Sequence, residues 1–198
     1  MIAVVQRVTS AQVSVDGKVI GKIDAGLVAL VAVTRNDGES DVNWMARKLL
    51  GLRIFRNGDK HFDSSIEQTG GSLLVISNFT VAAATRHGRR PGFDAAADPQ
   101  TGKKWFDELI IALRATGVRV ETGQFGANMQ VELTNDGPVT VLLDSGKCST
   151  RNLPFNGYSL THHRVSKAEL SQQSEHHLQA KLAKMNCAEV VQQTPPAA

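Results

Sequence analysis

The sequence predicts an α+β fold, and two kinds of pattern in its 198 residues support this. Apolar, β-branched runs recur between turn signals and indicate strands, whereas residues 42–50 and 101–116 carry apolar side chains at helical spacing. The chain is 41% hydrophobic, which is enough for an ordinary globular core. No apolar run is long enough to span a bilayer, so a membrane role is not expected.

The first half of the chain is expected to supply four strands before its helix. Residues 3–8 and 11–15 are β-branched or alternating, and Asp16-Gly17 is a hairpin signal that leads into a strand over 18–23. Residues 26–33 are apolar on both faces, as expected of a central buried strand. Residues 37–41 can cap a helix over about 42–50. A short strand over 52–55, closed by Asn57-Gly58, should follow.

The second half is expected to hold a second buried strand, a helix and three further strands. The buried strand is predicted over residues 72–81, after the Gly70-Gly71 turn, and an exposed basic loop follows over 85–91. The helix over 101–116 should end near Gly117, a C′ residue. The last strands are predicted over 118–121, 129–133 and 139–143, which puts residues 135–140 at or beside a strand junction.

The composition changes after Gly146, so we predict a domain over residues 1–146 and a polar C-terminal extension over 147–198. The domain carries 16 Lys+Arg and 16 Asp+Glu, and the extension carries 6 and 3, which is the whole net charge of +3. Four of the six histidines lie in the extension, but no Cys/His spacing fits a zinc site, and a solvated tail with one weak amphipathic helix is expected. With only two cysteines and no secretory signal, the cytoplasm is the expected compartment.

Gly137-Pro138 is the first stretch that points to a site. Pro138 fixes its own φ, Gly137 can take angles closed to other residues, and the bond between them can be cis at modest cost. A rigid turn of this kind could aim both carbonyl oxygens at a ligand. The alternative is an ordinary turn between two strands.

The second stretch is Ser77-Asn78-Phe79-Thr80, at the end of an apolar run. Backbone N–H groups released there could stabilise negative charge on a carbonyl oxygen, and the Thr80 hydroxyl could attack, position a water or donate a hydrogen bond. The alternative is that these hydroxyls only satisfy nearby backbone groups. A side-chain triad is not expected, because His61 and His87 lie outside both stretches and both cysteines lie in the extension.

Residues 1–145 resemble the D-aminoacyl-tRNA deacylase family throughout their length. The resemblance includes Val5-Gln6-Arg7-Val8, the run from Gly70 to Val75, and Ser77-Asn78-Phe79-Thr80-Val81, which stands against the family's Ser-Gln-x-Thr-Leu. It continues through residues 85–91 and 123–129 and closes on Asn135-Asp136-Gly137-Pro138-Val139-Thr140, a full match to Asn-x-Gly-Pro-x-Thr. The order and spacing of these pieces make the match specific.

The resemblance implies a compact, mostly antiparallel β-barrel-like sheet with flanking helices, assembled as a homodimer. It implies hydrolysis of the ester between a D-amino acid and the 3′-terminal adenosine of tRNA, without a cofactor or metal. In the family the Gly-Pro bond is cis and its loop reaches the partner's site. The residues implied for catalysis are Ser77, Asn78, Phe79 and Thr80, and those for substrate binding are Arg7, Phe125, Gly126, Ala127, Met129, Asn135, Gly137, Pro138 and Thr140.

Within this resemblance the Gly137 and Pro138 carbonyls would hold the substrate's α-ammonium, and Arg7 would orient their loop. Because glycine has no side chain to clash, glycyl-tRNA should be cleaved as well. Arg86, Arg89 and Arg90 would contact tRNA phosphates or else form a solvated turn. Asn78 departs from the family's Gln and is one methylene shorter, and the small run 82–84 replaces bulkier residues, so substrate range is open.

Two other functions remain open at this point. One is a related deacylase that edits L-amino acids mischarged on tRNA, against which the intact Gly137-Pro138 motif and Arg7 argue. The other is a dimeric nucleic-acid-binding module without catalytic activity, whose basic extension makes the contacts.

Overall fold

The computed structural model describes residues 1–86, 88–147 and 189–190. Almost all of the predicted C-terminal extension therefore lies outside the described residues, including the predicted amphipathic helix and the four histidines. The boundary at residue 146 stays a prediction.

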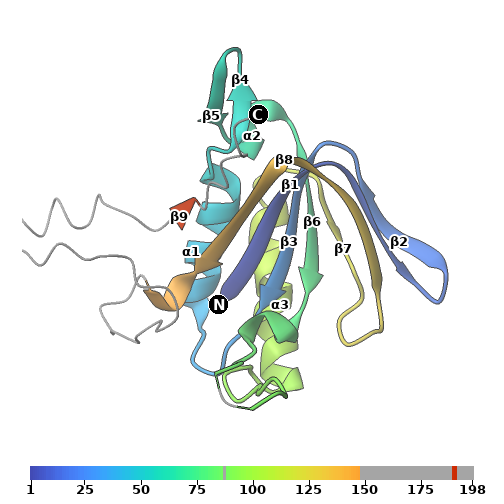
Figure 1. The fold of residues 1–198 in the computed structure, drawn as a ribbon, viewed down its shortest axis with the longest axis vertical. Coiled ribbons are helices and arrows are strands. Elements are labelled where there is room, and N and C mark those ends of the chain that lie inside the picture. The colour runs from blue at the N-terminus through green and yellow to red at the C-terminus, as the bar shows by residue number, and fades with distance from the viewer. Residues whose placement is uncertain (87, 148–188, 191–198) are drawn as a thin grey trace, which may run out of the picture.

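One curved mixed sheet and the helices on one of its faces make up the fold, which confirms the α+β prediction (Figure 1). The sheet runs in the order β7-β6-β3-β1-β8-β9, and β2 also pairs with β1. The β3–β6 and β6–β7 pairs are parallel, and the remaining pairs of this sheet are antiparallel. Gly21 of β2 lies against the Thr122 carbonyl of β7, so the sheet curls almost into a barrel. The strands are β1 (Ile2–Val15), β2 (Lys18–Ile23), β3 (Gly26–Ala32), β6 (Ser72–Ser77), β7 (Val120–Thr122), β8 (Gln130–Asp144) and β9 (Glu189–Val190).

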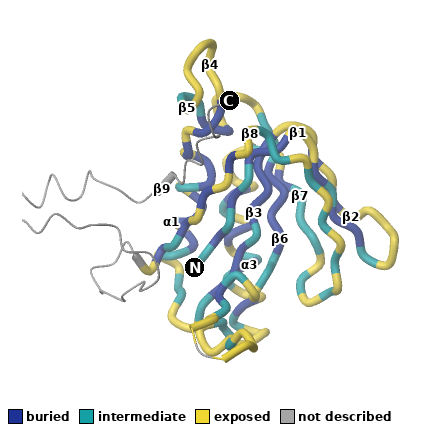
Figure 2. The backbone as a smooth tube through the Cα atoms, in the orientation of Figure 1, coloured by how far each residue is buried: buried dark blue, intermediate teal, exposed yellow. Residues whose placement is uncertain are grey.

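The helices lie on one face of this sheet and cover the main core. α1 (Glu39–Gly51) and α3 (Pro99–Arg114) pack behind the strands, while a hairpin of β4 (Phe55–Asn57) and β5 (Lys60–Ser64) projects at one end (Figure 1). Short turns of helix complete the fold: α2 (Ile66–Thr69), η1 (Phe79–Ala82) and η2 (Ser145–Lys147). Alternate residues of β1 and β3, such as Val5 and Ala29, are fully buried against these helices (Figure 2).

The opposite face holds a smaller core and is only partly covered. Val13, Ile23, Val28, Leu74 and Ile76 are buried there, because the long β1–β2 hairpin and the first half of β8 curl over the sheet. Leu142 on this side remains 42% exposed. The curl leaves the ends of β3 and β6 open to a cleft.

Several predicted element boundaries were wrong. The runs 3–8 and 11–15 form one strand, and so do 129–133 and 139–143, because a strand can absorb extra residues as a bulge without ending. The strand predicted over 72–81 ends at Ser77, where Asn78 caps a 3₁₀ turn. The strand predicted over 52–55 begins only at Phe55 and belongs to the β4–β5 hairpin, and β7 begins two residues later than predicted.

Other local predictions are confirmed in full or in part. Asp16 and Gly17 both have positive φ and form the tight β1–β2 turn, and β3 is buried almost throughout. The helix predicted over 101–116 is present but runs from Pro99 to Arg114, with Asp98 as its N-cap, so Gly117 (φ +84°) lies two residues beyond the C-cap and is not its C′ residue. In the described part of the chain, no helix combines the length and apolar character needed to cross a membrane.

A buried polar network ties the first strand to α1 and to the end of β8. The Met1 ammonium donates to the Ser145 hydroxyl at 2.6 Å and to Asp37, and Ser145 donates to the Asp41 carboxylate at 2.6 Å. Burial alone would raise the pKa of Asp41. The hydrogen bonds from Ser145 and the Gly38 N–H, the N-terminal charge and Ser40 outweigh it, and the pKa lies below its ordinary value of 3.8. The folded protein therefore favours the charged carboxylate.

This network predicts a pH dependence of stability. A carboxyl group whose pKa is lowered by folding stabilises the protein fully above its unfolded pKa and loses that contribution as the pH falls through the folded value. The free energy of unfolding, measured by urea titration from pH 6 to pH 3, should therefore fall less steeply in Asp41→Asn than in wild type. Ser145→Ala, which removes the strongest pKa-lowering bond, should show an intermediate slope. Identical slopes in all three proteins would contradict the role of Asp41.

Candidate functional site

A cleft of about 1230 Å³ lies between the open end of the sheet and the start of α3. The carboxyl ends of β3 and β6, the η1 turn, the loop before β8 and the first half of β8 line it. Eight of the residues predicted for the site line this one cleft: Ser77, Asn78, Phe79, Thr80, Phe125, Gly126, Ala127 and Met129. Two segments that are about 45 residues apart in the chain thus meet at one cavity, as expected where a parallel β3–β6 pair ends in an α/β arrangement.

Asn78 organises the η1 turn, which lines this cleft. Its side-chain oxygen accepts hydrogen bonds from the Thr80 N–H at 3.2 Å and from the Thr80 hydroxyl at 2.5 Å. The Asn78 N–H donates to the Val31 carbonyl at 2.8 Å and fixes the turn to β3. Among the described residues, the Phe79 N–H has no hydrogen-bond partner. The turn therefore offers one backbone donor and one held hydroxyl group to the cleft.

The exposed lining of the cleft, its rim, includes aromatic rings and charged groups. The rings of Phe79 and Phe93 meet edge to face with centroids 5.0 Å apart, and Phe79 is 57% exposed. The Asp98 carboxylate accepts hydrogen bonds from the Thr101 and Gln100 N–H groups, which lower its pKa and keep it charged. The rim can therefore stack on a planar group while it carries a fixed negative charge at the α3 terminus.

The remaining predicted residues form a second cluster around a bulge in β8. In the pairing with β1, Thr140 lies opposite Gln6 and Asn135 lies opposite Val8, so residues 136–139 bulge out between them. Asn135 closes the bulge: its oxygen accepts from the Val139 N–H at 2.8 Å, and its amide donates to the Thr140 hydroxyl at 3.2 Å. This places Asn135 and Thr140 in structural support of the turn.

The tip of the bulge is exposed and conformationally restricted. Gly137 and Pro138 are both exposed, the bond between them is cis, and Gly137 has φ +135°. A Cβ atom on Gly137 would lie 2.6 Å from the Val139 Cγ2 atom, so only glycine fits. The exposed tip is where a ligand could reach the carbonyl oxygens of both residues.

Arg7 supports this tip from beneath. Its side chain is buried; Nε lies 2.9 Å from the Asp136 carboxylate and donates to the Asp136 carbonyl at 3.2 Å, while Nη1 donates to the Ile54 carbonyl. The buried guanidinium group of Arg7 bonds both to the bulge and to the α1–β4 connection, so it holds one against the other. This contact supports the predicted role of Arg7.

The two clusters do not meet within one chain. Arg7 lies opposite Leu27 on β3, whereas Ser77 lies opposite Val31, so four residues of β3 separate the two levels. At about 3.3 Å per residue, this is a separation of roughly 13 Å along the strands, in addition to the lateral step from β1 to β6. None of Arg7, Asn135, Gly137, Pro138 and Thr140 lines the cleft.

The predicted tRNA-contact residues Arg86, Arg89 and Arg90 lie on an exposed loop, as expected, but do not line the cleft. Several lining residues were missed from the sequence, among them Arg35, Phe93, Asp98 and Thr101. The Asp98-Pro99 pair is a recognisable start of a helix, and it could have indicated Asp98 and Thr101 as lining residues. Arg35 and Phe93 carried no comparable signal.

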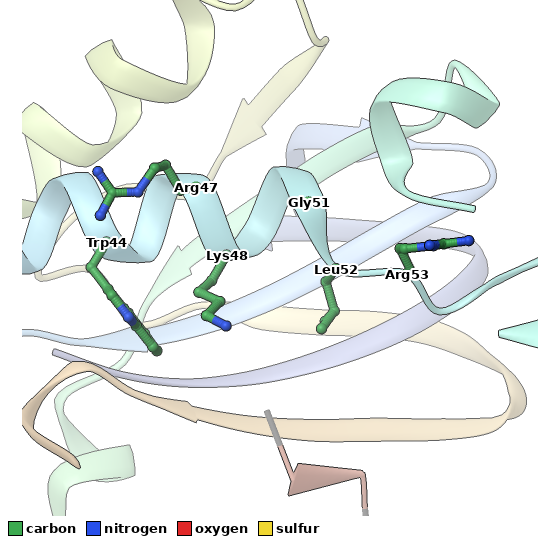
Figure 3. A pocket seen from close by; sticks show the side chains of 6 residues that line it. All are labelled: Trp44, Arg47, Lys48, Gly51, Leu52 and Arg53. Atoms are coloured by element: carbon green, nitrogen blue, oxygen red, sulfur yellow. The ribbon is translucent and has the colours of Figure 1, made fainter. Parts of the chain in front are cut away.

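A second, smaller hollow of about 430 Å³ lies along α1 (Figure 3). Trp44, Lys48 and Leu52 point to one side of the helix there, and the Lys48 ammonium lies 5.7 Å from the centre of the Trp44 ring. None of the residues predicted for the site lines this hollow. The larger cleft is therefore the candidate active site.

Fold and site together define an α+β protein with a mostly apolar cleft, whose polar groups include the amide and hydroxyl groups of residues 77–80; no histidine or cysteine of the described residues lines it. Two solved structures share the fold. "c-Myc DNA Unwinding Element Binding Protein" matches with a TM-score of 0.70 at 36% identity, over 73% of this chain and 98% of that one. "Structural Analysis of a probable eukaryotic D-amino acid tRNA deacylase" matches with a TM-score of 0.63 at 16% identity, over 72% and 97%.

The family model described as D-Tyr-tRNA(Tyr) deacylase matches residues 4–144. The D-aminoacyl-tRNA deacylase of Desulfitobacterium hafniense (strain DSM 10664 / DCB-2) is 48% identical over 74% of this chain and 99% of its own length. That of Methylococcus capsulatus is 52% identical over 72% and 94%. The chain belongs to the D-Tyr-tRNA(Tyr) deacylase family, which confirms the resemblance found in the sequence.

Proposed function

We propose that this protein hydrolyses the ester between a D-amino acid, or glycine, and the 3′-terminal adenosine of tRNA, and so removes D-amino acids before translation uses them. Membership of the deacylase family makes the chain a hydrolase of D-aminoacyl-tRNA. The finer proposal rests on two separate clusters. One is the cleft, which offers a backbone donor and a hydroxyl group, and the other is the exposed turn that carries the Gly137 and Pro138 carbonyl groups.

A homodimer would bring these clusters together. Two copies related by a two-fold axis present the same pair of surfaces to each other, so the Gly137–Pro138 tip of one copy can enter the cleft of the other, and the reverse. The partly covered sheet face, where Leu142 is 42% exposed, is the surface available for this contact. Each site would then combine Thr80 of one protomer with Gly137 of its partner.

In such a site the two carbonyl oxygens accept hydrogen bonds from the substrate's α-ammonium. D- and L-esters offer the same amine and carbonyl, so an ammonium anchor cannot distinguish them by itself. Discrimination requires a rigid surface that an L side chain would strike once the ammonium is bound. Arg7 and Asn135 make the turn rigid through the contacts described above. Glycine escapes the clash because it has no side chain.

Hydrolysis then requires polarisation of the ester carbonyl and an aligned water. The Phe79 N–H is the donor left for the carbonyl oxygen, since Asn78 already engages the Thr80 N–H. The water oxygen bonds to the carbonyl carbon, the bond to the ribose 3′-oxygen breaks, and that oxygen takes a proton lost by the water. The ribose 2′-hydroxyl can relay the proton, so the chemistry needs no histidine.

A nucleic-acid-binding function without catalysis is the second candidate, because one structural neighbour at 36% identity is titled as a DNA unwinding element binding protein. Deletion of residues 148–198 separates the two functions. The enzyme should hydrolyse D-tyrosyl-tRNA at an unchanged rate without the extension, because the proposed site lies within residues 1–147. Loss of tRNA affinity on deletion, with no turnover in either protein, would support the binding module instead.

A further inference from the structure

We propose that Arg35 binds the phosphate group on the 5′ side of the 3′-terminal adenosine, and so holds the end of the tRNA chain while the ester is cleaved. This inference rests on the proposed function and names one further contact of the same site. The adenosine that carries the amino acid is joined to the rest of the tRNA through this phosphodiester. A cleft that accepts the ester must therefore accommodate a negative charge only one ribose away.

Arg35 supplies the positive charge of the cleft. It is the one lysine or arginine among the described residues that line the cleft, it is exposed, and it forms no ion pair with another described residue. Asp98 supplies the one carboxylate of this lining, and it accepts hydrogen bonds from the Gln100 and Thr101 N–H groups at the start of α3. The guanidinium group of Arg35 is therefore the cation that the described lining offers to an anionic ligand.

A turn at the end of β3 fixes the backbone of Arg35. Arg35 is the second residue of the turn from Thr34 to Asp37, which the Asp37 N–H closes by donating to the Thr34 carbonyl at 3.2 Å. The Asp37 carboxylate accepts from the Thr34 N–H at 2.6 Å and from its hydroxyl at 2.9 Å, and it also binds the Met1 ammonium. The Arg35 N–H donates to the Ala95 carbonyl at 3.1 Å. The carboxylate nearest to Arg35 in the chain is thus engaged elsewhere, and the turn is formed before a ligand binds.

One loop segment links this turn to the place where the ester would lie. The Phe93 ring lies edge to face against the Phe79 ring at 5.0 Å, and the Ala95 carbonyl, two residues further on, holds the Arg35 N–H. Two residues span at most about 7 Å, and the long Arg35 side chain adds its own reach. An ester polarised by the Phe79 N–H can therefore present the phosphate of the same nucleotide to Arg35.

A guanidinium group suits this ligand, because its planar set of N–H donors matches two oxygens of one phosphate group. Every tRNA carries this phosphate, so the contact holds the substrate without selecting a particular tRNA. The phosphate also takes no part in the reaction. The contact is therefore equally strong in the ground state and in the transition state, and it should lower KM while it leaves kcat nearly unchanged.

The test compares two small esters of D-tyrosine, one on the 3′-hydroxyl of adenosine and one on the 3′-hydroxyl of adenosine 5′-monophosphate. Wild type should show a KM about tenfold lower for the ester that carries the phosphate. In Arg35→Ala the ratio of the two KM values should fall to about one, and in Arg35→Lys, which keeps the charge but loses the planar donors, it should be intermediate. Lys104→Ala, which removes an exposed cation of α3 outside the cleft, is the matched control and should keep the wild-type ratio.

The ratio separates a phosphate contact from a structural defect, because a damaged cleft would bind both esters less well and leave the ratio as it is. An unchanged ratio in Arg35→Ala, or equal KM values for the two esters in wild type, would overturn the proposal. With D-tyrosyl-tRNA, the slope of log KM against log salt concentration should be smaller by about 0.7 in Arg35→Ala, as expected for the loss of one phosphate contact to a single strand. An equal slope in both proteins would contradict the contact.

A second measurement does not depend on turnover. In NMR spectra of the wild-type protein, the resonance of the Arg35 Nε–H group should shift on addition of adenosine 5′-monophosphate and should not shift on addition of adenosine. If wild type hydrolyses neither the small esters nor D-tyrosyl-tRNA, the proposed function fails, and this titration still decides whether Arg35 binds the phosphate. The same response to both compounds, or no response to either, would overturn the assignment of Arg35.

Discussion

Mixing two inactive variants, Ala127→Trp and Gly137→Ala, is expected to restore deacylase activity. Trp at position 127 should fill the cleft that Ala127 lines. Ala at position 137 should distort the exposed turn, because its Cβ atom would lie 2.6 Å from Val139. Each variant alone should then lack one half of every site. In a mixed dimer, one of the two sites combines the intact cleft of one protomer with the intact turn of the other.

The expected recovery can be counted. After co-refolding at equal amounts, half of the two-fold dimers are mixed and each of these holds one complete site, so activity should reach about a quarter of the wild-type level. Asn135→Ala, which removes the bonds that close the turn, should complement Ala127→Trp in the same way if the turn is the active element. Unfolding midpoints near wild type serve as the control for each variant. A mixture no more active than its separate components would show that each site lies within one chain.

The shape of the cleft could be predicted from the sequence only in part. Ser77 to Thr80 were identified because polar groups at the end of an apolar strand stand out against a β pattern, whereas Phe125, Gly126, Ala127 and Met129 were identified only through the family resemblance. Their meeting in one cavity depends on the parallel β3–β6 pairing, which places the end of β6 beside Val31. Long-range pairing of this kind leaves no local signal, and Arg35 and Phe93 were missed for that reason.

The course of β8 shows a different limit. Asn135-Asp136-Gly137-Pro138 carries every local signal of a turn, and the sequence predicted a junction between two strands. The structure has one strand instead, because β1 pairs with both halves and the extra residues are accommodated as a bulge closed by Asn135. The local turn signal was therefore correct, but the long-range pairing with β1 decided that the strand continued through it.

Asn78 shows how a single side chain changes a local prediction. The apolar run from Ser72 continues through Val81, so its composition predicted one long buried strand. The Asn78 side chain captures the Thr80 N–H, and the chain turns into a 3₁₀ helix four residues before the predicted end.

The central claim, a filter for the chirality of the amino acid on tRNA, is tested most directly by hydrolysis of D-tyrosyl-, L-tyrosyl- and glycyl-tRNA side by side, with a chelator present. The rigid turn should reject an L side chain by steric clash, a penalty of at least about a hundredfold in kcat/KM. We expect the D-ester and the glycyl ester to be lost while the L-ester stays intact. Equal hydrolysis of the D- and L-esters, or no turnover of any of the three, would contradict the account.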